Sequence, residues 1–333
     1  MERPALSVVI PVYNHSGTVR QAVESALEQD YVGPYEVVVI DDGSTDSTPS
    51  LLAAYGQRIR IIRQQNLGRS AARNAGVRYS VADLIAFLDS DDYWMSGKIT
   101  AVIKSFEERP DIGLTYSDYY EVDSVDGRCL GIVSPPEDPS LEQMFHRLEC
   151  VGVPSSVAIR RAVFERAGGF DERLHWGEDI DIYLRLRQVC SFYRIPGQPL
   201  TVYRRRTKVE DSVRAYSPQT HAILERVMRE HFGRRANRLI KQMRNQRAAG
   251  LLTLALTQLN RREWRRALSS FAELATYRPM YAPRVALVLQ PEFKALGSPS
   301  PMAAVGALLM SSSPQRPGED MHGVGRTRPD QTP

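Results

Sequence analysis

The chain has 333 residues, of which 42% are hydrophobic and 25% charged. This length and composition allow one large core, or one large core with a small second unit, and they exclude a fibrous or wholly disordered chain. The net charge of +4 conceals an asymmetry, because carboxylates gather in the first half while arginines dominate from Arg204 to Arg266. The basic half is therefore a candidate surface for an anionic partner.

The cysteines and the apolar runs bear on the compartment. Cys129, Cys150 and Cys190 are odd in number and form no C-x-x-C pair, so neither a disulfide framework nor a zinc cluster is indicated. The apolar run Leu6 to Val12 begins almost at once and has the length of a strand, which leaves no room for a secretory signal. No stretch approaches the roughly 20 apolar residues of a membrane span. We therefore expect a cytoplasmic protein.

The first half alternates short β-branched runs with amphipathic stretches, which is typical of an α/β fold with a Rossmann-like parallel sheet and helices on both faces. The predicted strands, buried on both faces, are Leu6 to Val12, Tyr35 to Asp41, Ile59 to Arg63 and Leu84 to Leu88. Helices are predicted over Thr18 to Gln29 and Gly68 to Tyr79. Such folds bind ligands at the carboxyl ends of the strands, so the residues that follow each strand form the candidate site.

After Ile112 to Ser117 the pattern becomes mixed, and the polar, Pro-rich stretch Ser134 to Pro139 predicts a loop between two lobes. The second lobe is predicted to contain a helix at Leu141 to Leu148, a strand at Ser156 to Ile159, a helix at Glu178 to Val189 and a strand at Pro199 to Tyr203.

The remaining sequence is predicted to be helical from about Ser217 to Leu289. A helical pair, Ala248 to Leu259 and Glu263 to Tyr277, resembles one tetratricopeptide unit, but a single unit cannot bury its own face and no repeat array is expected. Beyond Gly297 the chain is rich in Ser, Pro and Gly and is predicted to be disordered. The predicted domains are an α/β domain at residues 1–215, a helical extension at 216–296 and a tail at 297–333.

The ends of the first two predicted strands place an aromatic ring and carboxylates around one crevice. The first strand runs into Pro11, Tyr13 and Asn14, and the second runs into Asp42. Asp42 could accept the N3 hydrogen of uracil or thymine while Tyr13 stacks on the ring. The alternative is a plain turn whose Asp46 caps the next helix. We favour a ligand role for Asp42 and leave Asp46 open between the two.

The run Asp89-Ser90-Asp91-Asp92 follows the fourth predicted strand and delivers three carboxylates into the same crevice. Like charges so close together require a cation, and Mg²⁺ or Mn²⁺ is held by one or two carboxylates and completes its shell with phosphate oxygens and water. The alternative is an acidic turn before the helix that runs on from Ser96. An isolated D-x-D is a weak motif, but its position in step with Asp42 favours a metal site.

A glycine-containing stretch, Asn66 to Gly76, lies between these two acidic segments and opens a predicted helix. Its Arg73 could contact a diphosphate or brace the acidic cluster, whereas Arg69 is as readily a surface residue. The chain has no G-x-x-x-x-G-K-[ST] and no G-x-G-x-x-G after the first strand, so P-loop and dinucleotide sites lose their main support.

The second lobe carries Trp176, Glu178 and Asp179 at the start of a predicted helix. The helix dipole holds such a carboxylate ionised, so it could take the proton of an attacking hydroxyl. The alternative is a purely structural cap. Trp176 favours the chemical role, because an aromatic face beside a carboxylate pair suits a sugar ring.

These elements in this order resemble the family 2 glycosyltransferases of the GT-A fold, and the similarity covers about Leu6 to Arg206. The resemblance implies an inverting enzyme that transfers a sugar from a UDP- or dTDP-sugar to a glycan or lipid-linked acceptor, in cell-surface polysaccharide biosynthesis. It implies donor binding by Pro11, Tyr13, Asn14, Asp42, Arg73, Asp89, Ser90 and Asp91, with Mn²⁺ or Mg²⁺ on Asp89 and Asp91. It further implies Asp179 as the base with Glu178 beside it. From the residues themselves, Trp176 and Asp92 are predicted to contact the acceptor, and the alternatives for Asp92 are a contact with the ion or only with the helix that follows.

The chain departs from the family pattern at Tyr203-Arg204-Arg205-Arg206, where members often have Tyr-Arg-x-His. The Q-x-x-R-W motif and the membrane spans of processive relatives are absent, which implies a single-addition enzyme. Because acceptors of such enzymes are often lipid-linked, the basic helices are a candidate for peripheral contact with the inner face of a membrane, and no nucleic acid is expected.

Two other classes remain as alternatives. A nucleotidyltransferase that makes nucleotide sugars would share the sheet and the metal, but it would need a Gly-rich, lysine-containing loop after the first strand. A non-catalytic binding module could use the basic helices alone. Retention of the acidic cluster together with Glu178 and Asp179 favours the enzyme over that module.

Overall fold

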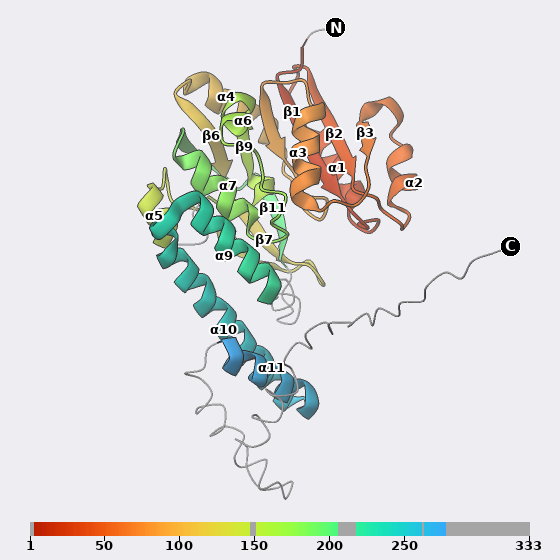
Figure 1. The fold of residues 1–333 in the computed structure, drawn as a ribbon. Helices are drawn as coiled ribbons and strands as arrows, with labels where there is room; N and C mark the ends of the chain where they lie inside the picture. Colours follow the sequence, from red (N-terminus) through yellow and green to blue (C-terminus); the bar gives the residue numbers. More distant parts are fainter. Residues whose placement is uncertain (1–2, 147–150, 206–217, 262, 278–333) are drawn as a thin grey trace, which may run out of the picture. The chain divides into compact units, whose positions relative to one another are not determined.

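The computed structural model describes residues 3–146, 151–205, 218–261 and 263–277 (Figure 1). This part of the chain forms two compact units, one ending at Gly250 and the other beginning at Leu251. The predicted tail at 297–333 and the end of the predicted helical region lie outside the described residues.

The first unit is built on a seven-stranded sheet whose strand order is β10-β6-β9-β4-β1-β2-β3. Its strands are β1 (Leu6–Val12), β2 (Tyr35–Asp41), β3 (Arg60–Arg63), β4 (Leu84–Phe87), β6 (Ile112–Ser117), β9 (Val157–Arg160) and β10 (Ser191–Ile195). β1 pairs in parallel with β2 and β4, and β2 with β3, whereas β9 runs antiparallel to β4 and β6. The parallel half therefore brings the carboxyl ends of β4, β1 and β2 to one edge.

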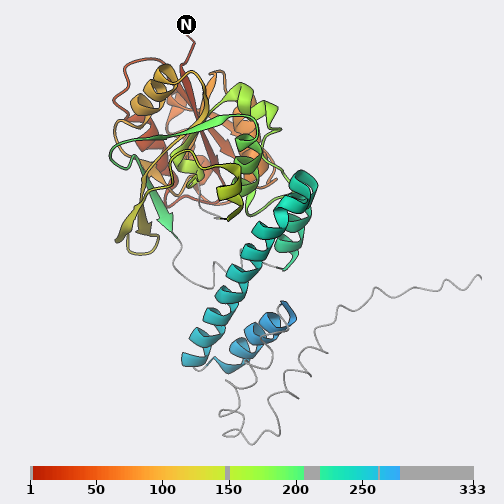
Figure 2. The same cartoon turned by 90° about the vertical axis from the view of Figure 1, so that its left-hand side faces the viewer.

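A second sheet of four strands has the order β5-β11-β7-β8. Its strands are β5 (Tyr93–Trp94), β11 (Thr201–Arg205), β7 (Tyr119–Asp123) and β8 (Cys129–Val133). Figure 2 shows the β7 and β8 hairpin projecting from the edge of the first unit. Because β5 directly follows the acidic run and pairs with β11, this small sheet anchors the acidic run at its far end.

Helices cover both faces of the larger sheet, as predicted. The helices of the described residues are α1 (Val19–Leu27), α2 (Thr48–Ala53), α3 (Arg69–Tyr79), α4 (Lys98–Glu108), α5 (Leu141–His146), α6 (Arg161–Arg166), α7 (Glu178–Arg187), α9 (Pro218–Phe232), α10 (Ala236–Asn260) and α11 (Trp264–Tyr277), with single 3₁₀ turns η1 (Gly56–Arg58), η2 (Pro154–Ser156) and η3 (Gly233–Arg235).

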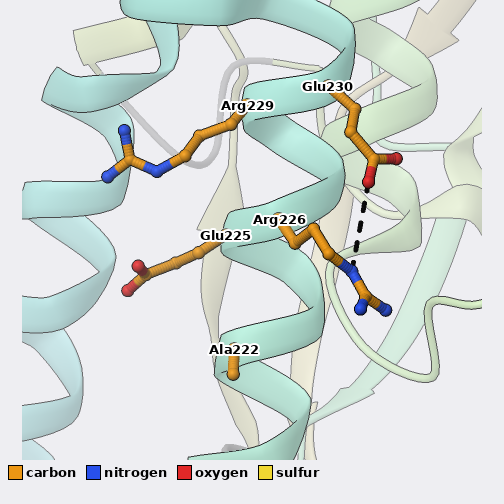
Figure 3. A pocket seen from close by; sticks show the side chains of 5 residues that line it. All are labelled: Ala222, Glu225, Arg226, Arg229 and Glu230. Carbon is orange, nitrogen blue, oxygen red and sulfur yellow. Dashed lines mark ion pairs between the residues drawn. The ribbon is translucent and has the colours of Figure 1, made fainter.

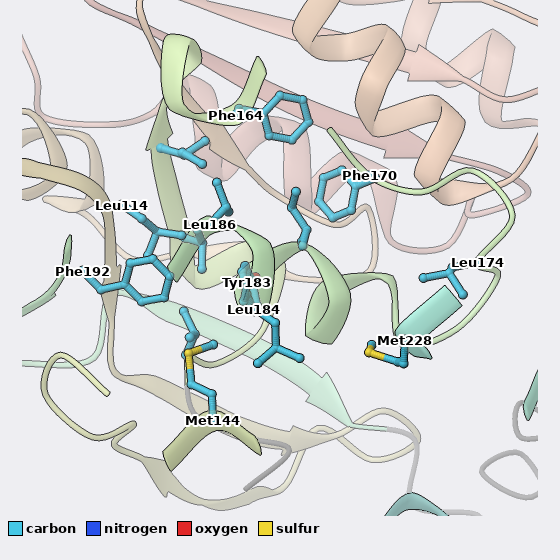
Figure 4. Packing of buried hydrophobic residues seen from close by; sticks show 14 of the residues in the cluster. Leu114, Met144, Phe164, Phe170, Leu174, Tyr183, Leu184, Leu186, Phe192 and Met228 are labelled. Carbon is cyan, nitrogen blue, oxygen red and sulfur yellow. The ribbon is translucent and has the colours of Figure 1, made fainter. Parts of the chain in front are cut away.

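Strand periodicity explains the two faces. In β1, Val8 and Ile10 join the core formed with α1 and α4, while Val9 joins the opposite core, formed with α6, α7 and α9. Figure 4 shows side chains of β6, α6, α7 and α9 converging in this second core. The same core extends to Met243 of α10, so the compact unit continues beyond residue 215, where the predicted α/β domain ends.

The predicted elements agree with the structure to within a few residues at most ends, with one correction. β3 lies at the edge of the sheet, and Arg60, Ile61 and Arg63 are exposed, so the expectation that this strand is buried on both faces is wrong. An edge strand has a partner on one side only, and here its arginines remain in solvent. Five elements were not predicted from the sequence: β5, β7, β8, β10 and α6.

In the second unit, the end of α10 packs with α11. Leu251 and Ala255 are buried there with Phe271 and Leu274, and Ser270 Oγ donates to Gln258 Oε1 at 2.9 Å. None of the described helices combines the length and the apolar composition that crossing a membrane requires.

A close approach between α3 and β1 generates a test of the packing. A Cβ atom on Gly76 would lie 2.1 Å from Val9 Cγ1. We expect Gly76→Ala to lower the free energy of unfolding by about 1–3 kcal/mol, because overpacking forces the helix off the sheet. Urea denaturation measures the change. The matched control is Gly17→Ala, since no atom lies within 4 Å of a Cβ there; equal losses in both variants would contradict the packing argument.

Candidate active site

The loops after β1 and β2 are joined by Asn14. This residue has a left-handed backbone with φ 53°, its amide donates to Ser44 Oγ at 3.0 Å, and its side-chain Oδ1 accepts from Thr45 N at 2.8 Å. Pro11 is buried within β1, whereas Tyr13 is 43% exposed at the opening. Of the first-strand residues predicted to contact a donor, Tyr13 and Asn14 are therefore exposed and Pro11 is not, and Asn14 also shapes the loop.

Asp42 is buried and fastens the loop before α3. Its carboxylate accepts hydrogen bonds from Gln64 Nε2 at 2.7 Å, Leu67 N at 3.0 Å and Gly68 N at 2.8 Å. A nucleobase bound at this carboxylate would have to share oxygens that already accept hydrogen bonds from the protein. The contact with uracil or thymine therefore stays a prediction. Asp46 accepts from Thr48 N at 2.9 Å, at the start of α2, which favours the capping alternative for this residue.

The four residues of the acidic run have different surroundings. Asp89 is partly exposed and accepts from Arg73, and Asp91 is also partly exposed. The Ser90 hydroxyl lies 2.7 Å from His15 Nδ1. Asp92 is fully buried. The run thus has two partly exposed carboxylates, those of Asp89 and Asp91, and one buried carboxylate, that of Asp92.

Asp92 is held by elements behind the crevice. Its Oδ2 accepts from Ser155 Oγ at 2.5 Å and its Oδ1 from Arg204 N at 2.9 Å. Burial, and then the charges of Asp91 and Asp89, raise the pKa of Asp92 well above its ordinary value. This position gives no support to the predicted acceptor contact of Asp92.

Arg73 connects the acidic run to the second lobe. Its guanidinium is 2% exposed and donates to Asp89 Oδ1 at 2.6 Å and to Glu178 Oε1 at 2.8 Å. Its Nε has no hydrogen-bond partner within the described part of the chain. Of the two roles predicted for Arg73, the structure shows the bracing of the acidic cluster.

Glu178 and Asp179 open α7 and differ in availability. Glu178 is buried against Arg73, while Asp179 is partly exposed and accepts from Ile180 N at 2.9 Å. Desolvation by the surrounding protein, and then the charge of Glu178, raise the pKa of Asp179 to about 6. Asp179 is therefore the carboxylate of this pair with the reach and the proton affinity of a base.

Trp176 precedes this pair and has one ring face occupied. The ring stacks on His221 of α9, with centroids 6.1 Å apart and planes 16° from parallel. Its contact with an acceptor stays a prediction.

Three further residues contact the acidic run, of which the sequence pattern named only Arg204, as part of the run Tyr203 to Arg206, and gave no role to His15 or Ser155. Arg204 donates to Asp91 O at 2.6 Å, and its guanidinium lies 5.1 Å from the Tyr93 ring centroid. His15 and Ser155 belong to no motif, although His15 directly follows Asn14. Arg206, which takes the place of the family's histidine, lies outside the described residues.

The acidic run offers a suitable donor set for a divalent cation. Within the described residues no group of three or more His, Cys, Asp or Glu side chains is arranged to hold a metal. Mg²⁺ binds through one or two carboxylates plus substrate phosphates rather than in an all-protein cage. The partly exposed carboxylates of Asp89 and Asp91 fit that mode.

A separate hollow lies along α9, lined by Ala222, Glu225, Arg226, Arg229 and Glu230 (Figure 3). Arg226 lies 4.0 Å from Glu230, and Glu225 pairs with Arg244. No strand-end residue lines this hollow, so the candidate active site is assigned to the crevice on the chemistry of its residues.

The buried arginine generates a test. Arg73→Met leaves Asp89 and Glu178 without their shared cation, and we expect a loss of about 3–5 kcal/mol in the free energy of unfolding, measured by urea denaturation. Arg69→Met is the matched control, because Arg69 is 54% exposed and lies 3.7 Å from the same Glu178 carboxylate. That control is expected to lose about 1 kcal/mol or less. Equal losses in the free energy of unfolding would show that the buried ion pairs of Arg73 contribute no more to stability than the exposed contact of Arg69.

Comparison with known proteins identifies the family. The model for Glycosyl transferase family 2 matches residues 7–168, and the model for Glycosyltransferase like family 2 matches residues 143–245. An uncharacterized glycosyltransferase of Haemophilus influenzae is 31% identical over 232 residues, which cover 68% of this chain and 76% of that protein. Succinoglycan biosynthesis protein ExoO of Rhizobium meliloti is 36% identical over 191 residues, or 53% of each chain.

The chain spans 61% of the length of an uncharacterized glycosyltransferase of Rickettsia prowazekii, to which it is 29% identical over 57% of its own length. Among solved structures, S. aureus TarS 1-349 has a TM-score of 0.54 and 17% identity, with 93% of each chain covered. That likeness shows the fold, which is the GT-A fold. The chain belongs to glycosyltransferase family 2.

Proposed function

We propose that the protein is an inverting glycosyltransferase that transfers a sugar from a nucleotide-diphosphate sugar to a glycan or lipid-linked acceptor. The observation that carries this proposal is the bridge made by Arg73 between Asp89 and Glu178. It holds reachable carboxylates suited to a cation and a diphosphate next to Asp179, which is suited to act as a base. This arrangement supports a site in which donor binding and proton removal take place side by side.

The relatives support the substrate classes. TarS 1-349 has been crystallised with UDP-GlcNAc and with UDP, which supports a UDP-type donor here, with a dTDP-type donor as the second choice. ExoO is named for succinoglycan biosynthesis, which supports a role in cell-surface polysaccharide synthesis.

The proposed reaction is a direct displacement. Asp179 takes the proton of the acceptor hydroxyl, whose oxygen forms a bond to the anomeric carbon as the bond from that carbon to the diphosphate oxygen breaks. A divalent cation, when bound by Asp89 and Asp91, would supply neutralisation of the charge on the departing diphosphate. The exposed ring of Tyr13 would stack on the uracil or thymine ring of the donor, and the ion pair with Arg73 would hold Asp89 in position.

A peripheral association with an anionic membrane surface remains a prediction, as does a cytoplasmic location. Residues 231–250 contain no Asp or Glu, and Arg234, Arg235, Arg238 and Lys241 are exposed around the start of α10. A Lys or Arg side chain close to an anionic membrane surface is attracted to it by about 1 kcal/mol.

Donor binding tests the proposed function. In a panel of nucleotide sugars with Mn²⁺, we expect UDP-sugars to raise the thermal unfolding temperature, by a stabilisation of about 2.7 kcal/mol at a hundredfold excess over Kd. Asp91→Ala and chelation by EDTA are expected to abolish this shift. The matched control is Asp83→Ala, an exposed carboxylate on the loop before β4. Donor affinity that is the same with and without chelator would remove the metal from the proposal.

The base assignment predicts a pH profile. Because the base must be ionised, turnover is expected to fall about tenfold per pH unit below the Asp179 pKa of about 6 and to be level above it. Asp179→Asn is expected to cost about a hundredfold or more in kcat while UDP binding is retained. Initial rates from pH 5 to 8 measure the profile. Near-normal turnover of a folded Asp179→Asn variant would show that another group is the base.

A further inference from the structure

Ser155 lies behind the acidic run and contacts it at two points. Its Oγ accepts the amide hydrogen of Asp89 at 3.0 Å and donates its own hydrogen to Asp92 Oδ2 at 2.5 Å. The residue is fully buried and is 63 positions away from Asp92 in the sequence. One hydroxyl therefore fixes both ends of the four-residue run.

Ser155 is itself held in place through its backbone. Its carbonyl accepts from the Trp94 indole at 2.7 Å and from Thr201 Oγ1 at 3.2 Å. The next carbonyl, that of Ser156, accepts from the buried Lys98 Nζ at 2.7 Å. The turn η2 is thus hydrogen-bonded to β5, to β11 and to the first turn of α4. These bonds hold the backbone of Ser155, from which its hydroxyl projects, in place.

The fixed position of the Ser155 hydroxyl matters because the acidic run would have to present its oxygens to a cation in a defined geometry. Hydrogen-bond partners behind the ligands orient the oxygens that a cation binds, and Mg²⁺ demands near-ideal geometry. Ser155 orients the peptide at Asp89 directly. Through Asp92, whose other oxygen accepts from Arg204 N, it also sets the backbone that carries Asp91.

We infer that Ser155 is a positioning residue for the site at Asp89 and Asp91 where the cation and the nucleotide diphosphate bind. It acts through the peptide of Asp89 and the carboxylate of Asp92 and touches no substrate. This inference rests on the proposed function and deepens it, because it extends the donor site to a residue outside every motif.

The test compares Ser155→Ala with Ser156→Ala in the full chain. The two serines are adjacent and fully buried in the same turn, but the Ser156 hydroxyl donates to Val153 O and has no bond to the acidic run. Calorimetry measures the affinity for UDP with Mn²⁺, electron paramagnetic resonance measures bound Mn²⁺ in the presence of UDP, and urea denaturation measures stability. We expect Ser155→Ala to weaken UDP with Mn²⁺ by about tenfold or more, and Ser156→Ala by about twofold or less.

Each outcome has a defined meaning. If Ser155→Ala binds UDP with Mn²⁺ like the parent, or no worse than Ser156→Ala, the inference is rejected. If the parent itself binds neither UDP nor dTDP with Mn²⁺, the proposed function fails instead. Should Ser155→Ala not fold, Ser155→Cys fills similar space with a weaker hydrogen-bonding group; a folded Ser155→Cys variant with parental affinity would equally reject the inference, and a loss of affinity would support it.

Discussion

The structure depends on a buried ion-pair bridge. Arg73 of α3 lies between Asp89, which follows β4, and Glu178 at the start of α7. Arg73 and Glu178 are 105 positions apart in the sequence. Burying a guanidinium is costly unless its charge is paired, so the positions of α3, the β4 end and α7 are mutually dependent. The bridge therefore fixes how the second lobe meets the parallel sheet, and it does so at the crevice where the chemistry is proposed.

The bridge also divides the carboxylates into two groups. Asp42, Asp92 and Glu178 are buried and bound to protein donors, whereas Asp89, Asp91 and Asp179 remain partly exposed. Arg73 neutralises part of this negative charge by pairing with Asp89 and Glu178, and Asp89, Asp91 and Asp179 are the members that solvent reaches. The hydrogen bonds of the buried members help to fix the backbone that carries the exposed members, so the acidic residues include structural supports as well as the proposed reactive groups.

The helices and strands that a local residue pattern determines could be predicted from the sequence. The apolar runs of β1, β2 and β4 and the amphipathic faces of α1 and α3 are visible in the chain itself, and with them the order of the site residues. The short β5 and its pairing with β11 across more than a hundred residues carry no local signal. Ser155 was missed for the same reason, because a serine's role in holding Asp92 exists only once the two lobes have met. The exposure of β3 depends on its edge position, which periodicity does not reveal.

The helices after residue 215 contact the segment that carries the proposed base. His221 of α9 stacks on Trp176, His231 Nδ1 lies 2.7 Å from Asp181 Oδ1, and Leu224 packs so closely on Gly177 that a Cβ there would come within 2.7 Å of it. These contacts flank Glu178 and Asp179 on both sides. A catalytic domain bounded at residue 215 would lack them, and α7 would lose the surface against which its first turn is packed. The functional unit is therefore better drawn through α9, which also agrees with the second family model, whose match runs to residue 245.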